Sequence, residues 1–261
     1  MLPIADSDLK TTSRPYVNLA LIAICAVVFI YGQIIGGSER AILFYRYGVI
    51  PSELSQGLNY VALEVWGGHY VDIATPFSNW VTIFTSMFIH GSWLHFLGNM
   101  LFLWVFGDNV EDRFGHFRYL LFYLAAGVAG VWLQIATSLT SENPMIGASG
   151  AIAGVLGAYL FLFPYSRIRT AVIFFFIVFV RIPAFLLLSF WFVLQFFGGL
   201  GSLPSADSGG VAYWAHIGGF LTGIIVVIIY KLGTGQGLWP RGPGGGVNAP
   251  PEVKYWRGRP L

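Results

Sequence analysis

Several long apolar runs constrain this chain more than any other feature of its sequence. A helix that crosses a bilayer needs about 20 consecutive, predominantly apolar residues, because the hydrocarbon core is about 30 Å thick. Hydrophobic residues make up 56% of the chain and charged residues only 10%, whereas soluble domains carry about 25% charged residues. The sequence therefore predicts a membrane protein with several spans and excludes a water-soluble globule.

The apolar runs predict an all-α, polytopic bundle of six spans. They extend over about residues 17–35, 80–106, 119–137, 147–163, 183–199 and 211–230. The segment 38–78 mixes charged residues, proline and glycine with apolar side chains, and it is expected to form a long first loop partly embedded in the membrane interface. The predicted organisation is an N-terminal segment over 1–15, a six-span domain over 16–232 and a tail over 233–261. This tail is rich in glycine and proline, cannot bury a core and is expected to be disordered.

Basic residues predict the orientation of the spans, because cytoplasmic loops carry an excess of Lys and Arg. Of the 14 Lys and Arg residues, only Arg40 and Arg46 fall on one side of the predicted arrangement, and the rest fall on the other. Both termini are therefore expected in the cytoplasm. Arg181 is placed at the membrane face, since a charge at the bilayer centre is costly. The apolar stretch 170–180 before it is expected in the interface.

Ser149 and His216 are polar residues of predicted spans, where such residues mark functional sites by default. From Ser149 onward the fourth span rises only about 21 Å at 1.5 Å per residue, so the serine lies below the outer surface within reach of water. Glycines such as Gly154 and Gly219 allow the fourth and sixth helices to approach closely. A serine hydroxyl within about 3 Å of an imidazole has the geometry of general-base activation. The alternatives are a packing serine and a histidine that makes an interhelical hydrogen bond.

His95 and Asn99 are spaced i and i+4 on the second span and so share one helix face. Both side chains can donate hydrogen bonds, which a hydrolase needs to stabilise an oxyanion. No Asp or Glu lies inside a span near them, so the sequence favours a Ser-His dyad over a three-member triad. The histidines have neither an HExxH pair nor a nearby carboxylate. No metal and no other cofactor is therefore expected.

Three motifs, HGSWLHFLGN, GASG and AHIGGFLTG, lie in order on the second, fourth and sixth spans. Together they resemble the rhomboid intramembrane serine proteases over essentially the whole six-span region. The resemblance implies Ser149 as nucleophile and His216 as general base. It implies an oxyanion site made by His95, Asn99 and the backbone N–H of Ser149, with Gly147 allowing tight packing before the serine. It also implies a rhomboid-like bundle whose fifth span acts as a lateral gate.

The resemblance leaves the orientation of His216 open. Ala153 is small at a position where some relatives carry an aromatic residue that supports the histidine. Trp191 and Gln195, spaced i and i+4 on the fifth span, are candidates to line the gate. The alternative is that they form an interfacial tryptophan with a hydrogen-bonding neighbour.

The expected function is that of an intramembrane serine endopeptidase in the plasma membrane of a prokaryote. Its partners would be the lipid bilayer and single-span membrane proteins, cleaved in or near their transmembrane segments. The alternative is a catalytically silent rhomboid-like protein that binds membrane clients, although such a binder has no need for both Ser149 and His216. A net charge of only +2 gives no indication of a nucleic-acid partner. A solute transporter would need polar residues through the membrane midplane and repeat symmetry, and neither is evident.

Overall fold

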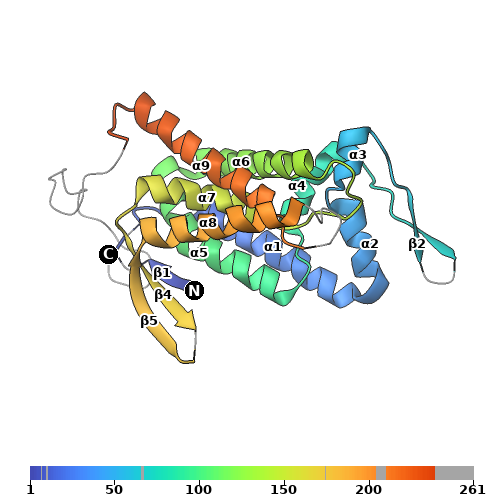
Figure 1. Cartoon of the computed structure of the whole chain (residues 1–261), viewed down its shortest axis with the longest axis horizontal. Coiled ribbons are helices and arrows are strands. Elements are labelled where there is room, and N and C mark those ends of the chain that lie inside the picture. Colours follow the sequence, from blue (N-terminus) through green and yellow to red (C-terminus); the bar gives the residue numbers. More distant parts are fainter. Residues whose placement is uncertain (7, 10, 66–67, 174, 204–209, 239–261) are drawn as a thin grey trace.

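The computed structural model describes residues 1–6, 8–9, 11–65, 68–173, 175–203 and 210–238, and long helices dominate it (Figure 1). In chain order the elements are β1 (Leu2–Asp6), α1 (Tyr16–Ile35), α2 (Gly37–Tyr47), α3 (Pro51–Gln56), β2 (Ala62–Val65), β3 (His69–Asp72), η1 (Asn79–Val81), α4 (Thr82–Thr85), η2 (Ser86–Phe88), α5 (Trp93–Phe114), α6 (His116–Thr137), α7 (Ser149–Leu162), β4 (Arg167–Ile173), β5 (Ile177–Pro183), α8 (Ala184–Ser202) and α9 (Tyr213–Gly233). From residue 239 onward, the tail that the sequence predicts to be disordered lies outside the described residues.

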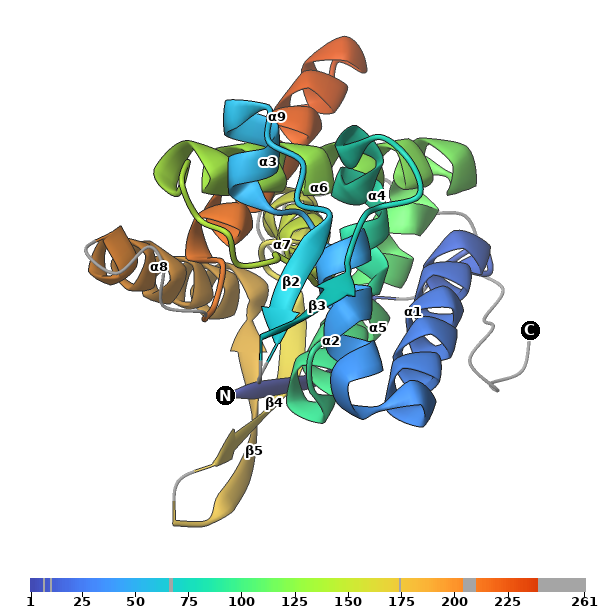
Figure 2. The ribbon, with the colours of Figure 1, turned by 90° about the vertical axis from the view of Figure 1, so that its right-hand side faces the viewer.

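The short helix α7 forms the centre of the bundle. Helices α5, α6, α8 and α9 all pack against it, and Figure 2 shows it between them. Its sequence consists of small, aliphatic and aromatic residues, and most of them are buried. Tyr159, for example, is fully buried and meets the ring of Phe106 on α5 edge-on. Its glycine and alanine residues let neighbouring helices approach closely, which suits its central position.

Helices α7 and α9 approach each other closely, as their glycines predict. A Cβ atom at Gly219 would stand 1.9 Å from the carbonyl oxygen of Gly150, and one at Gly223 would stand 2.0 Å from that of Gly154. Any side chain at these two positions of α9 would therefore overlap the backbone of α7. The close approach brings the N-terminal ends of the two helices together.

Four helices, α1, α6, α8 and α9, are long and apolar enough to cross a membrane. Helix α5 has 22 residues but carries acidic side chains in its last two turns, and α7 has only 14 residues. The six helices expected from the apolar runs are present in the expected order. That all six of them cross the membrane stays a prediction.

The helix of the predicted second span begins later than residue 80 and continues past residue 106, to Phe114. Residues 79–88 form the short turns η1, α4 and η2, and α5 starts only after Ser92. Thr82 and Ser86 each donate a hydroxyl hydrogen bond to the carbonyl oxygen three residues earlier, a local bond that competes with regular helix. Ser92 caps α5 by accepting the backbone N–H of His95 at 3.2 Å. The apolar run over 80–106 therefore did not indicate where the helix starts.

The fold is mostly helical, but it is not all-α as predicted. Strands β1, β4 and β5 form an antiparallel sheet. The N-terminal segment and the apolar stretch 170–180 therefore contain strands, and Figure 1 shows the β4–β5 hairpin projecting across the direction of the helices. The first loop also has regular structure, with α2, α3 and the β2–β3 hairpin. Stretches rich in Val, Ile and Phe favour strands, which explains why an apolar segment outside the bundle forms a hairpin.

Acidic residues at the end of α5 hold the chain that leads into α1. Glu111 is completely buried and accepts the backbone N–H groups of Val17 and Asn18 at 3.0 and 2.7 Å. These are N–H groups of the first turn of α1, which have no partner within their own helix. Asp112 accepts the hydroxyl of Ser13 at 2.7 Å. These two acidic residues thus tie the end of α5 to the start of α1 and to the chain just before it.

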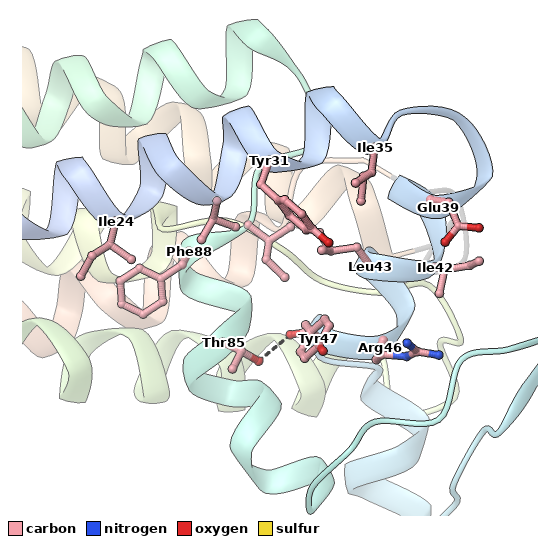
Figure 3. Close-up of a pocket in the computed structure, with 12 residues that line it drawn as sticks. Ile24, Tyr31, Ile35, Glu39, Ile42, Leu43, Arg46, Tyr47, Thr85 and Phe88 are labelled. Atoms are coloured by element: carbon pink, nitrogen blue, oxygen red, sulfur yellow. Dashed lines mark hydrogen bonds between the residues drawn. The ribbon is translucent and has the colours of Figure 1, made fainter.

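A cavity of about 440 Å³ lies between α1 and α2 (Figure 3). Its walls are mainly apolar and include Ile24 and Tyr31 of α1 and Leu43 of α2. Thr85 lines the cavity and donates a hydrogen bond to the carbonyl oxygen of Tyr47 at 2.7 Å. None of the predicted site residues is among the described residues that line this cavity. Most of them line a different cavity, described below.

Candidate active site

The structure brings Ser149 and His216 together. Ser149 is the first residue of α7, and His216 lies in the first turn of α9. The Oγ atom of Ser149 is 2.7 Å from Nε2 of His216, a distance at which the imidazole can take the hydroxyl proton. The close packing of the two helices sets this distance, since a Cβ atom at Gly150 would stand only 3.4 Å from the carbonyl oxygen of Ala215.

Gln195 of α8 contacts the other nitrogen of the same imidazole. Its Oε1 atom is 2.7 Å from Nδ1 of His216. One turn earlier on α8, the ring of Trp191 lies 5.8 Å from the imidazole, centroid to centroid, with the planes tilted by 34°. The sequence placed both residues on one face of the fifth span but did not reveal their contact with the histidine. The available signal was a glutamine in a mostly apolar helix.

His95 and Asn99 lie on one face of α5, as their spacing predicts, and both line the same cavity as Ser149. The Nδ2 atom of Asn99 is buried and has no hydrogen-bond partner. Such orphaned donors are rare in native structures and call for an explanation. A bound ligand that accepts a hydrogen bond provides one.

Gly147 is needed at its position for two independent reasons. Its φ angle is +127°, which residues with a side chain rarely adopt. A Cβ atom there would also stand 2.6 Å from Nε2 of His95 and 3.7 Å from Oγ of Ser149. The absence of a side chain thus allows the imidazole of His95 to lie beside the serine.

The candidate residues surround a cavity of about 700 Å³ to which α5, α6, α7, α8 and α9 contribute. Its lining includes the polar side chains of His95, Asn99, Gln134, Ser149, Gln195 and His216. No Asp or Glu is among the described residues that line it. Within the described ranges of the chain, no three His, Cys, Asp or Glu side chains are grouped so that they could hold a metal ion.

The arrangement has the parts that acyl transfer requires. Ser149 provides a hydroxyl, and His216 provides a base within hydrogen-bond distance. Asn99 offers a free donor to the same cavity. Because Ser149 begins α7, its backbone N–H has no carbonyl partner within the helix, and the positive end of the helix dipole favours negative charge there.

Several known proteins are similar in sequence to this chain. A family model described as the rhomboid domain matches residues 78–232, which include every candidate residue of the cavity. Rhomboid protease GluP of Bacillus subtilis (strain 168) is 32% identical over 150 residues, 57% of this chain and 25% of that protein. Rhomboid protein 1, mitochondrial, of Saccharomyces cerevisiae is 35% identical over 92 residues, 34% of this chain and 27% of that protein. RHOMBOID-like protein 4 of Arabidopsis thaliana is 31% identical over 208 residues, 77% of this chain and 47% of that protein.

The chain spans less than half of the length of each of these relatives. The family model, in contrast, covers more than half of the chain and includes α5 to α9. With its several apolar helices and this match, the chain is a membrane protein that belongs to the rhomboid family.

Proposed function

We propose that this protein is an intramembrane serine endopeptidase. The observation that carries the proposal is the 2.7 Å contact between Oγ of Ser149 and Nε2 of His216, at the edge of a cavity that also contains an unpaired Asn99 amide. A hydroxyl paired with a base is the signature of an activated nucleophile. Membership of the rhomboid family, which includes a relative named as a protease, supports the same reaction.

In the proposed reaction, Nε2 of His216 takes the proton of Ser149 while Oγ attacks the peptide carbonyl carbon. The carbonyl oxygen becomes an oxyanion and accepts hydrogen bonds from Asn99, His95 and the backbone N–H of Ser149. The C–N bond then breaks, and the leaving amine takes the proton from the imidazolium. A water molecule next gives a proton to His216 and attacks the resulting ester. Release of the new carboxyl group returns the proton to Ser149, so atoms and charges balance.

The proposed substrate is the helix of a single-span membrane protein that loosens near its outer end. The peptide carbonyls of an intact helix are engaged in internal hydrogen bonds, so the segment has to unwind before Oγ of Ser149 can reach one. The 14 residues of α7 rise about 21 Å at 1.5 Å per residue, which is less than the hydrocarbon thickness of about 30 Å. With the other end of α7 at the cytoplasmic surface, Ser149 lies within the membrane and close to the outer surface.

The direct test is cleavage of a fluorescent transmembrane peptide by the purified protein in liposomes. We expect cleavage by the natural chain and a loss of at least about 10³-fold in Ser149→Ala, because the nucleophile carries most of the chemical step. Ser189→Ala, which changes a serine of α8 that does not line the cavity, serves as the matched control and should leave the rate unchanged. Undiminished cleavage by Ser149→Ala would remove the serine from the mechanism.

The second candidate function is a catalytically silent rhomboid-like protein that binds membrane clients. It is favoured only by family membership, because rhomboid proteins need not all be active. A fluorophosphonate that labels activated serines separates the two. Labelling that disappears in Ser149→Ala supports the protease, whereas a natural chain that binds a client helix but never reacts with the reagent supports the silent binder.

We further propose a prokaryotic plasma membrane with both termini in the cytoplasm. The uneven distribution of Lys and Arg between the two sides supports this orientation. A reporter fused to the C-terminus tests it, since alkaline phosphatase is active only outside the cytoplasm and green fluorescent protein is fluorescent inside. An active phosphatase at the C-terminus would reverse the orientation.

A further inference from the structure

We infer that Gln195 is the residue that positions His216, by holding the imidazole in the tautomer that the dyad needs. The inference rests on the proposed function, because it assigns a role within the same site. Its geometric basis is the 2.7 Å contact between Oε1 of Gln195 and Nδ1 of His216.

The tautomer of His216 follows from its two contacts. Nε2 faces the hydroxyl of Ser149 at 2.7 Å, and it can accept the serine proton only if it carries no hydrogen. In a neutral imidazole the hydrogen is then on Nδ1, which needs an acceptor when buried. His216 is 8% exposed, so water is not the main partner. The amide oxygen of Gln195 is the acceptor at hydrogen-bond distance.

The face of α8 that carries Gln195 also fixes the plane of the ring. Trp191, one turn before Gln195, lies 5.8 Å from the imidazole and 6.0 Å from the ring of Phe220, centroid to centroid. Ala153 lies one turn after Ser149 on α7 and is fully buried, but its single methyl group has no polar atom to orient a histidine. The orientation of the base is therefore set by α8, which carries neither member of the dyad.

A neutral acceptor suits this position. The cavity has no Asp or Glu among its described lining residues, and an ionised carboxylate buried there would be costly whenever the imidazole is uncharged. An amide oxygen selects the tautomer by a hydrogen bond alone, without stabilising the imidazolium by a full negative charge. Among the described residues, the imidazole of His216 thus hydrogen-bonds to a hydroxyl and to an amide. Gln195, as the third member beside Ser149 and His216, is uncharged.

The experiment compares Gln195→Leu with Leu194→Ala in the cleavage assay. Gln195→Leu keeps the size of the side chain but removes the acceptor, and we expect kcat to fall by about 10²-fold or more with KM nearly unchanged, in line with the contribution of general-base catalysis. Leu194 is half exposed on the same helix, and Leu194→Ala should stay within about twofold. A Gln195→Leu enzyme as fast as the natural chain would overturn the inference.

A second measurement reads the tautomer without relying on activity. In protein labelled with ¹⁵N-histidine, with the His216 signal assigned by its loss in His216→Asn, we expect the Nδ1–H form in the natural chain and a mixture of both tautomers in Gln195→Leu. An unchanged tautomer in Gln195→Leu would overturn the inference. A natural chain that shows the expected tautomer but neither cleaves nor reacts with a fluorophosphonate would instead contradict the proposed function alone.

Gln195→Glu is a second variant that tests the same contact if Gln195→Leu does not fold. The carboxylate keeps an acceptor at the same place and adds a negative charge that favours the imidazolium. We expect this variant to remain active with the acidic limb of its pH–rate profile shifted to higher pH. A pH–rate profile identical to that of the natural chain would show that residue 195 does not contact His216 during the reaction, which would also overturn the inference.

Discussion

At the scale of single residues, Asn99 provides the sharpest test of oxyanion stabilisation. Its Nδ2 atom is buried and unpaired although it could donate two hydrogen bonds. We expect Asn99→Ala to lower kcat by about 10²- to 10³-fold with little change in KM, because a donor to an oxyanion acts mainly in the transition state. Steady-state cleavage of the transmembrane peptide measures this. Asn59→Ala, in an exposed loop, is the control, and an Asn99→Ala enzyme with a normal kcat would exclude this donor.

The residues of the site differ in how far the sequence can predict them. Ser149, His216 and the pair on α5 stand out because polar side chains are rare inside apolar spans, and the structure brings Ser149 and His216 into contact. The contact of Gln195 with the histidine could not be predicted, because it depends on how far α8 is rotated about its axis against α9. Helical spacing fixes which residues of one helix share a face, but not which face of the neighbouring helix they meet.

At the scale of helices, the close approach of α7 and α9 predicts that one added methyl group lowers both stability and activity. Gly219→Ala would place a Cβ atom 1.9 Å from the backbone oxygen of Gly150, and that oxygen cannot move without α7. Overpacking of this kind typically costs about 1–3 kcal/mol or more. We expect a clear fall in thermal stability in detergent together with a loss of cleavage, since the same contact sets the distance between Ser149 and His216.

Gly233→Ala is the matched control on the same helix. Nothing lies within 4 Å of a Cβ atom at this last position of α9, and its backbone is helical. Equal melting temperatures for the natural chain and Gly219→Ala would show that α9 can shift away from α7 at no cost. In that case the packing of these two helices would not control the site.

Helix and strand limits were harder to predict than the order of the helices. The apolar runs located the helices that follow the first loop because burial in lipid requires length and hydrophobicity together. They could not separate residues 79–88 from α5, since hydrophobicity does not report where hydroxyl groups bond to the backbone. They also could not show that the stretch 170–180 pairs with the N-terminal segment. Strand pairing between β1 and β4 joins residues far apart in the sequence, and no local pattern encodes it.

At the scale of the whole molecule, the β4–β5 hairpin raises the question of where the protein meets the membrane surface. The hairpin follows α7 and leads directly into the first residue of α8. It therefore lies at one end of the helix bundle. Phe176, just before β5, is 80% exposed, and the first three residues of β5 are also exposed and apolar. Arg169 and Arg181 face each other across the two strands nearer to the bundle. Exposed apolar residues next to arginines are typical of segments that lie in a membrane interface.

The sequence-based expectation that this stretch lies in the interface can be measured by the depth of a spin label. Cys25 is the only cysteine of the chain, so Cys25→Ala gives a background in which Phe176→Cys or Arg181→Cys carries the only label. In liposomes we expect the label at 176 to be accessible to oxygen, which concentrates in lipid, and protected from a water-soluble nickel complex. The label at 181 should show the greater accessibility to nickel, because arginine side chains keep their charge at the polar surface. High nickel accessibility at both positions would place the hairpin in water, and its apolar end would then need a protein partner to cover it.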